Sequence, residues 1–388
     1  MSDRVNELMD AVKGNDAAGV RRVLGSHGAE LKPTLGSPIP GWIFGETPLI
    51  AAARAQNHEM IELLLDAGAD VNGRTNWWAG GFGVLDEAAS NSELAEYLIE
   101  RGAYVDVHAA ARLGKLDHLR MLIGAAPSLV RARGGDGMLP LHFASTVEIA
   151  RYLVEECGAE MDACDVDHES TAAQYMVRDR QDIAQYLVSR GGRTDILMAA
   201  AFGDTALVER HIDAIRTCVS PEWFPMTDRR AGGSIYTWTL GEWKTAHQIA
   251  REFGHSAVYQ MLMDRSPAGL RLVVACESGE DVGWGVVDEE DFPRLVNAAK
   301  SNDAAKVRRM LDCGWPVDAR DDGASALHWA AFHGNAGLVS LLCERGAAID
   351  VTDSNHGSTP SGWTEYGATN SWLAKTGDYP AVINLLRQ

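Results

Sequence analysis

Residues 322–335 read Asp322-Gly323-Ala324-Ser325-Ala326-Leu327-His328-Trp329-Ala330-Ala331-Phe332-His333-Gly334-Asn335, and they decide the fold. Ser325 precedes an apolar run and can cap the free N–H groups at the start of a helix. The pair Ala330-Ala331 lets neighbouring helices approach closely, and Gly334 suits the left-handed turn at a helix end. A second apolar run, Leu-Val-Ser-Leu-Leu, follows at 338–342, and a Gly-Ala turn comes after it. The stretch therefore predicts two short helices joined by a tight turn.

The same pattern recurs along the chain. It is clearest at 45–72 and at 137–144, and weaker copies fill the intervals. Because self-similarity at a fixed period marks repeat architectures, the copies together predict roughly twelve helix pairs. Aligned on the start of the first helix, the copies lie near Glu7, Pro48, Val84, Asp106, Pro140, Ala172, Asp195, Ala246, Arg271, Arg294, Ala326 and Pro360.

This series resembles the ankyrin consensus, in which a helix opening with Thr-Pro-Leu-His is followed by a glycine break, a second helix ending in Leu-Leu, and a Gly-Ala turn. The resemblance implies an all-α ankyrin-repeat solenoid with enlarged finger loops, the hairpin-like loops between successive helix pairs. We predict one continuous array over residues 1–388. Its parts are an N-terminal cap at 1–30, central repeats at 31–279 with insertions at 31–45, 73–83 and 218–244, an acidic connector at 280–292, and C-terminal repeats with a cap at 293–388.

A looser resemblance connects the chain to bacterial ankyrin proteins with long Trp-rich insertions between repeats. It implies a fold and no assigned activity. The segments that carry it are 224–226, 231–241, 246–255 and 326–335.

The charge of the chain limits its partners. A net charge of −19, with no basic run of five residues or more, repels phosphate backbones and anionic membrane surfaces. No apolar run of 18 residues is present to span a bilayer. We therefore expect a cationic or neutral partner, not nucleic acid or membrane. The N-terminal residues lack the layout of a secretory signal and the six cysteines form no Cys-x-x-Cys pair, which favours a cytoplasmic protein.

Tryptophan concentrates in four long insertions, at 31–45, 73–83, 218–244 and 353–372, which hold eight of the eleven tryptophans. A large ring in a glycine-rich loop either packs on its own scaffold, which stiffens the finger, or lines a groove for a sugar, an apolar molecule, a cation or a peptide. Both uses remain open for individual rings. The predicted ligand-binding residues are Trp42, Trp77, Trp78, Phe82, Trp223, Tyr236, Trp238, Trp243, Trp363 and Trp372.

Acidic residues near these rings form a second set of candidates. Paired acids beside aromatic rings can act as general acid and base in hydrolysis or elimination. A solvent-exposed or turn-capping role is the alternative for each of them, and the acids of 280–291 are expected to form a solvated connector. The candidate catalytic residues are Asp86, Glu87, Asp167, Glu169 and Glu242.

Histidines and glycine motifs give no metal or cofactor signature. His108, His142 and His328 match the repeat position whose imidazole ties adjacent loops together by hydrogen bonds. The other histidines follow no His-x-x-x-His or His-Glu-x-x-His spacing, and the Gly-Trp-Gly at 283–285 lacks the third glycine of a dinucleotide-binding loop. We therefore expect no metal and no cofactor.

The leading hypothesis is a cytosolic binding scaffold that mediates protein-protein interaction through a concave groove lined by aromatic fingers. The alternative is an enzyme, a hydrolase or lyase acting on a glycan or another small organic substrate in a Trp-lined pocket. A deep cavity that gathers Trp77, Trp78, Trp238 and a carboxylate would favour the enzyme. A shallow groove, with rings packed against their own loops, would favour the scaffold.

Overall fold

The computed structural model describes residues 3–39, 43–219, 234–280 and 283–387. It is mostly helical, which confirms the expected all-α repeat fold. The chain divides into two compact units, the first made of Met1–Met198 with Val219–Glu242 and the second of Ala199–Cys218 with Trp243–Gln388. No helix in the described segments is both long enough and apolar enough to cross a membrane.

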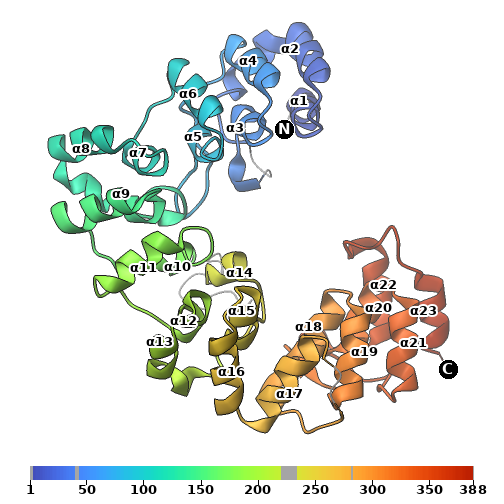
Figure 1. The fold of residues 1–388 in the computed structure, drawn as a ribbon. Helices are drawn as coiled ribbons and strands as arrows, with labels where there is room; N and C mark the ends of the chain where they lie inside the picture. The colour runs from blue at the N-terminus through green and yellow to red at the C-terminus, as the bar shows by residue number, and fades with distance from the viewer. Residues whose placement is uncertain (1–2, 40–42, 220–233, 281–282, 388) are drawn as a thin grey trace. The chain divides into compact units, whose positions relative to one another are not determined.

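Helices of the first unit follow one another as short antiparallel pairs (Figure 1). Its α-helices are α1 (Asp3–Lys13), α2 (Ala17–Leu31), α3 (Pro48–Arg54), α4 (His58–Asp66), α5 (Val84–Glu87), α6 (Ser92–Glu100), α7 (Val107–Arg112), α8 (Leu116–Ala125), α9 (Val147–Arg151), α10 (Ala172–Tyr175), α11 (Gln181–Ser189) and α14 (Tyr236–Thr239). Its shorter helical turns are η1 (Lys32–Thr34), η2 (Ile43–Gly45), η3 (Pro127–Arg131), η4 (Gly135–Gly137), η5 (Pro140–Phe143) and the π-helical η6 (Tyr152–Glu156).

The second unit continues the same plan, and α12 (Ile196–Phe202) passes from one unit into the other. Its helices are α13 (Thr205–Arg210), η7 (Ile212–Ala214), α15 (Ala246–Glu252), α16 (Ser256–Arg265), α17 (Ala268–Glu277), η8 (Glu289–Asp291), α18 (Pro293–Lys300), α19 (Ala304–Cys313), α20 (Ala326–Phe332), α21 (Ala336–Glu344), α22 (Pro360–Asn370) and α23 (Tyr379–Leu385). Strands β1 (Arg320–Asp321) and β2 (Ala324–Ser325) pair antiparallel just before α20.

Side chains at the helix ends explain why the pairs begin and turn where they do. Thr47 accepts a hydrogen bond from the Ile50 N–H at 3.3 Å and so caps α3, which opens with Pro48. Gly334 takes a φ of 66° between α20 and α21, a left-handed conformation that costs glycine little. Asn335 then caps α21 by accepting from the Leu338 N–H at 2.9 Å. The capping and turn signals in the sequence therefore set the helix pairs.

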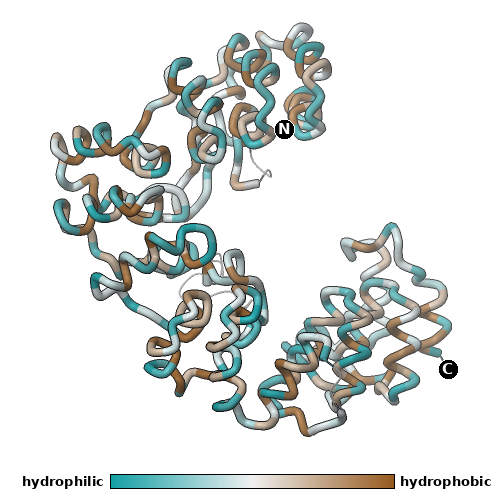
Figure 2. The backbone as a smooth tube through the Cα atoms, in the orientation of Figure 1, coloured by the Kyte–Doolittle hydropathy of each residue, from teal (hydrophilic) through white to brown (hydrophobic). Residues whose placement is uncertain are grey.

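The core runs between helices of successive pairs. Hydrophobic and hydrophilic residues alternate along the helices in Figure 2, as expected for helices that bury one face. Small alanines allow α18 and α20 to lie close together, while leucines of α19 and α21 fill the space behind them. The fully buried residues of α20 and α21 include Leu327, Ala330, Ala331, Leu338, Val339 and Leu342.

Three buried histidines tie each repeat to the next one. The Nε2 atoms of His108, His142 and His328 donate to backbone carbonyl oxygens 24, 28 and 30 residues further along the chain. The distances are 2.9, 3.1 and 3.2 Å. The structural role predicted for these imidazoles is confirmed.

Helix α22, capped by Thr359, begins at the copy expected near Pro360 and takes up residues 360–370 of the insertion at 353–372. Two expectations differ from the structure. The copy near Arg271 contains only α17, since the next helical element in the described residues is η8. The acidic connector is not fully solvated, because Asp291 is buried and accepts a hydrogen bond from Arg294.

Candidate ligand-binding site

An aromatic cavity of about 460 Å³ lies beside α20 and α22 in the second unit. Trp329 and Phe332 project from one face of α20, because residues three apart share a helix face. Trp363 and Tyr366 occupy the corresponding positions of α22 in the next repeat, and Trp372 follows shortly after that helix. Two adjacent repeats therefore supply four rings, and the segment behind them supplies the fifth. This is the aromatic cavity in the rest of the text.

The rings of the aromatic cavity meet mostly edge to face. Trp329 and Trp363 have centroids 5.0 Å apart and an angle of 77° between their planes. Phe332 lies 5.7 Å from Trp372 at 64° and 6.0 Å from Trp363 at 77°. Tyr366 differs, since it stacks on Phe332 at 27°. The rings therefore line one cavity at different inclinations instead of offering one flat surface.

Close backbone packing holds α22 against α20. A Cβ atom on Gly367 would lie 2.1 Å from the carbonyl oxygen of Phe332, so only glycine permits this approach. The Tyr379 hydroxyl lies 3.2 Å from that same carbonyl oxygen and 3.0 Å from the carbonyl oxygen of Gly367. The spacing of the aromatic walls is therefore set by the scaffold.

His333 anchors the segment that carries Trp372. Its Nε2 donates to the Lys300 carbonyl oxygen at 2.8 Å, which leaves Nδ1 to accept from the Ser371 hydroxyl at 3.0 Å. Burial lowers the pKa of His333, which favours this neutral form. The Trp372 ring packs 4.7 Å from the imidazole, yet 65% of the residue remains exposed. Trp372 is thus held in place with most of its surface available.

A buried carboxylate lies behind the cavity wall. Asp353 accepts a hydrogen bond from Trp363 Nε1 at 3.0 Å and others from the backbone N–H groups of Asn355, His356 and Ser358. Burial alone would raise the pKa of Asp353, but these donors lower it to about 2. The carboxylate therefore stays charged and fixes the Trp363 ring.

The finger at 73–83 uses its rings differently. Trp77 packs with its centroid 4.4 Å from Phe44 and 6.1 Å from Trp78, and Phe82 lies 6.2 Å from Phe44. Phe82 also fits against Gly135, where a Cβ atom would come within 2.3 Å of the ring. These rings pack on one another and on a neighbouring turn, as expected for rings that stiffen their own finger loop.

The third insertion contributes one exposed ring among its described residues. Tyr236 is buried, and its hydroxyl donates to Asp195 at 2.8 Å. Trp243 packs against the Arg294 guanidinium, 5.8 Å from the ring centroid. Trp238 on α14 is 75% exposed. Trp42 and Trp223 lie outside the described residues.

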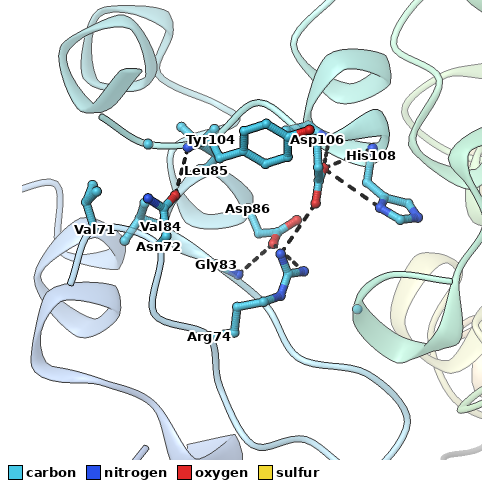
Figure 3. A pocket seen from close by; sticks show the side chains of 13 residues that line it. Val71, Asn72, Arg74, Gly83, Val84, Leu85, Asp86, Tyr104, Asp106 and His108 are labelled. Atoms are coloured by element: carbon cyan, nitrogen blue, oxygen red, sulfur yellow. Dashed lines mark hydrogen bonds and ion pairs between the residues drawn. The ribbon is translucent and has the colours of Figure 1, made fainter. Parts of the chain in front are cut away.

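Asp86 and Glu87, both in α5, form structural contacts, and those of Asp86 are drawn in Figure 3. Asp86 accepts from the Gly83 N–H at 2.7 Å, and Arg112 lies 3.7 Å away. Glu87 holds Arg54 through two hydrogen bonds of 3.1 and 2.9 Å. The cavity beside Asp86 measures only about 40 Å³, which is too small for a sugar ring.

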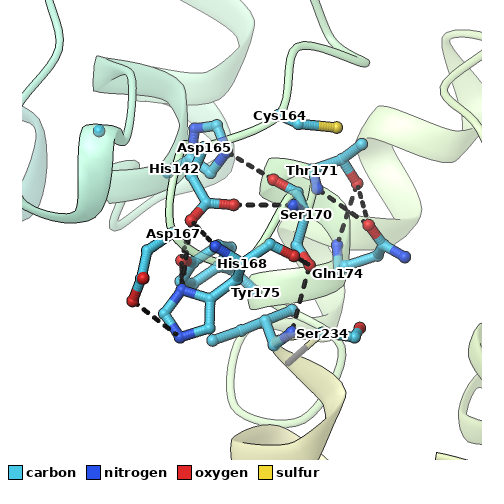
Figure 4. A network of polar contacts seen from close by, with 12 residues as sticks. His142, Cys164, Asp165, Asp167, His168, Ser170, Thr171, Gln174, Tyr175 and Ser234 are labelled. Atoms are coloured by element: carbon cyan, nitrogen blue, oxygen red, sulfur yellow. Dashed lines mark hydrogen bonds and ion pairs between the residues drawn. The ribbon is translucent and has the colours of Figure 1, made fainter. Parts of the chain in front are cut away.

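A buried polar network surrounds His168 (Figure 4). Asp165 Oδ2 lies 3.2 Å from His168 Nδ1 and accepts from the Tyr175 hydroxyl at 3.0 Å, while Asp167 lies 3.7 Å from Nε2. Burial alone would lower the pKa of His168, but the Asp165 carboxylate raises it. Burial raises the pKa of the adjacent Asp136 carboxyl to about 6. The other two acidic candidates, Glu169 and Glu242, are exposed.

Within the described parts of the chain, two groups of side chains offer atoms close enough to share a cation. In each group the ligand atoms lie within 4.8 Å of one another. Hard divalent cations prefer such carboxylate oxygens, and His168 would add a nitrogen. The groups are Asp136, Asp167 and His168 in the first unit, and Asp288, Glu290 and Asp291 in the second.

Of the predicted ligand-binding residues, the structure places Trp363 and Trp372 together at the aromatic cavity. Sequence reasoning missed Trp329 and Phe332 as binding residues because they lie inside the repeat motif that identifies the fold. Tyr366 was also left out, although it lies in the same insertion as the predicted Trp363 and Trp372. The available signal was the recurrence of two aromatic residues, three apart, at the same positions of consecutive repeats.

Comparisons with known proteins agree with the helix pairs. A family model for ankyrin repeats matches three segments, 8–109, 107–198 and 246–353. Similar curated proteins include palmitoyltransferase AKR1 of Yarrowia lipolytica, 39% identical over 67 residues, and palmitoyltransferase Hip14 of Drosophila melanogaster, 30% identical over 70 residues. Serine/threonine-protein kinase 12 of Arabidopsis thaliana is 36% identical over 85 residues. These matches cover 17%, 18% and 22% of this chain, but only 9%, 11% and 17% of those proteins.

Proposed function

Because this chain belongs to the ankyrin-repeat family, we propose that it is a binding scaffold, and that it holds a segment of a partner protein in the aromatic cavity. The partner segment inserts one side chain between α20 and α22. The residues that contact it are Trp329, Phe332, Trp363, Tyr366 and Trp372. The proposed setting is the cytosol, which the absence of disulfides among the six cysteines favours.

One observation carries this proposal: the cavity leaves large aromatic rings open to solvent on a rigid support. Tyr366 and Trp372 are 63% and 65% exposed, although both belong to a packed cluster. Covering an exposed aromatic side chain stabilises a complex by about 1.5–3 kcal/mol, so these two rings supply the driving force for a modest interface. Aromatic residues in such pockets are typical hot spots of protein recognition.

The net charge of the chain limits which partner segments it can attract. With a net charge of −19, long-range attraction favours a segment that is basic or neutral and opposes an acidic one. We therefore extend the proposal to a partner segment without net negative charge.

A positional-scanning peptide array, probed with the full chain, tests the proposal. Each array position varies one central residue among the natural amino acids and methylated lysines in a neutral background. The expected result is a set of binders whose signal falls by about thirtyfold with Trp372→Ala, the loss of roughly 2 kcal/mol typical of a hot spot. Trp284→Ala is the matched control, since Trp284 belongs to the same unit, is 75% exposed and does not line the cavity. Equal binding by both variants would reject the proposal.

The enzyme alternative retains one supporting observation. Asp136, with its raised pKa of about 6, lies with Asp167 and His168 near the Trp77 finger, and a carboxyl with a raised pKa keeps a larger protonated fraction that can donate a proton. A panel of glycosides incubated with the wild type and with Asp136→Asn tests it. Turnover that the variant loses would support the enzyme, and equal or absent turnover would reject it.

A further inference from the structure

We propose that the aromatic cavity recognises a trimethylammonium group, carried on a trimethylated lysine of the partner segment. This inference rests on the proposed function and specifies the chemistry of the side chain that enters the cavity. Three features of the cavity point to it: the arrangement of the rings, the polar groups that line it, and the charge placed behind its wall.

The rings form several faces of an enclosure. An aromatic face carries negative partial charge, so a cation within about 6 Å of several ring centroids is attracted by each of them. Trp329 and Trp363 stand at 77° to each other, and Phe332 stands at 64° to Trp372. Because all five rings line the same cavity, a roughly spherical cation can contact several of them, whereas a flat ring can stack on only one.

The lining distinguishes a quaternary cation from a primary one. Among the residues that line the cavity, the side chains with polar atoms besides the aromatic ones are His356 and Ser358, and no carboxylate is present. A primary ammonium has three N–H donors, and each donor buried without an acceptor costs about 1–3 kcal/mol. A trimethylammonium group has no N–H donor and is less strongly hydrated. It therefore enters this cavity with the smaller desolvation cost.

Charge near the wall favours a cation over a neutral group of the same shape. The buried Asp353 carboxylate accepts the Trp363 Nε1 hydrogen bond at 3.0 Å, which places negative charge at the edge of that indole. Hydrogen bonding to an anion polarises the ring and strengthens the negative potential of its face. Lys300 Nζ lies 5.0 Å from the Trp329 ring centroid and already interacts with that ring, so the attraction for a second cation comes from the Trp363 ring.

A lysine side chain is the source that fits the scaffold. Its long apolar stem can pass between the exposed rings of Tyr366 and Trp372 while the flanking peptide lies over α20 and α22. The negative charge of the chain attracts the basic residues beside it. A free quaternary metabolite would fill the cavity but would leave these outer contacts unused.

Isothermal titration calorimetry of the full chain tests the proposal with four probes. Three are one peptide that carries lysine, trimethyllysine or the neutral isostere in which a carbon atom replaces the quaternary nitrogen. The fourth is choline. We expect the trimethyllysine peptide to bind roughly tenfold or more tightly than the lysine peptide, the isostere and choline. Trp372→Ala should remove this preference, and Trp284→Ala should keep it.

Two results would overturn the inference, and each differs from failure of the proposed function. If the isostere binds as tightly as the trimethyllysine peptide, then shape and apolar contact explain recognition, and the scaffold function stands without the cation. If choline binds as tightly as the peptide, the source is a small metabolite and the lysine assignment is wrong. A peptide array that lacks any binder dependent on Trp372 would reject the scaffold function itself.

Discussion

The contact between α20 and α22 can be tested by a single added methyl group. In Gly367→Ala the new Cβ would lie 2.1 Å from the carbonyl oxygen of Phe332 and 2.8 Å from its carbonyl carbon. Both obstacles are backbone atoms, so α22 must move away from α20. Overpacking of this kind costs about 1–3 kcal/mol, and the 2.1 Å contact places this substitution near the upper end. Alanine regains up to about 1 kcal/mol of helix propensity, which leaves a net loss of about 2 kcal/mol.

Gly362→Ala is the matched control for this prediction. Gly362 lies in the same helix, but its added Cβ would meet only the Ser358 side chain, at 3.5 and 3.6 Å, which is ordinary contact. The same gain in helix propensity then applies without a clash, so stability should stay level or rise by up to about 1 kcal/mol.

Urea unfolding, followed by far-ultraviolet circular dichroism and tryptophan fluorescence, measures both variants. We expect the midpoint of Gly367→Ala to fall below that of the wild type and the midpoint of Gly362→Ala to equal or exceed it. Peptide binding provides a second readout, because displacement of α22 moves Trp363 and Tyr366 away from Phe332. If Gly367→Ala is as stable as Gly362→Ala and binds the peptide as tightly as the wild type, the close contact does not define the cavity.

Three other side chains give further predictions. Arg294→Met should destabilise the chain in urea unfolding by up to about 3–5 kcal/mol, because the buried Glu277 and Asp291 carboxylates each lose a guanidinium 3.0 Å away and Glu277 keeps only Lys306 as a cationic partner; an unchanged midpoint would contradict this. Because the pKa of Asp353 falls from its usual 3.8 to about 2 in the folded chain, the ionised carboxylate stabilises the fold above pH 3.8, and this stability is lost as the pH falls towards about 2. The difference in melting temperature between wild type and Asp353→Asn should therefore shrink over that pH range. The raised pKa of Asp136 has the opposite effect, because ionisation of this carboxyl destabilises the folded chain as the pH rises from 3.8 through about 6. The melting temperature of Asp136→Asn should therefore exceed that of the wild type at pH 7 but not at pH 3. A pH-independent difference would contradict either of the last two predictions.

The fold was predictable because its determinants are local. Thr47 and Pro48 cap and open a helix, Gly334 takes the left-handed turn, and the buried imidazoles of His142 and His328 tie neighbouring loops. Each of these roles depends on residues close in sequence or one repeat away, so the pattern alone indicates them. The prediction of a helix pair near Arg271 was wrong, because a local apolar stripe predicts one helix but not whether a partner helix follows it.

The binding site was only partly predictable. Trp363 and Trp372 were predicted because they are aromatic residues outside the repeat consensus. Trp329 and Phe332 were not predicted because they lie within a repeat helix that matches the consensus. Whether a ring is buried, packed on another ring or left open depends on contacts between repeats that composition does not reveal. Tyr236 illustrates this, because its insertion is rich in aromatic residues and yet its hydroxyl is held by Asp195 in the interior.

The most direct test of the account is the affinity of the full chain for the trimethyllysine peptide, measured by calorimetry for the wild type, Trp372→Ala and Trp284→Ala. The account predicts a saturable interaction in the wild type that Trp284→Ala retains and that Trp372→Ala weakens by roughly thirtyfold. Equal affinity in all three proteins, with circular dichroism showing each of them folded, would contradict it and place recognition elsewhere on the repeats.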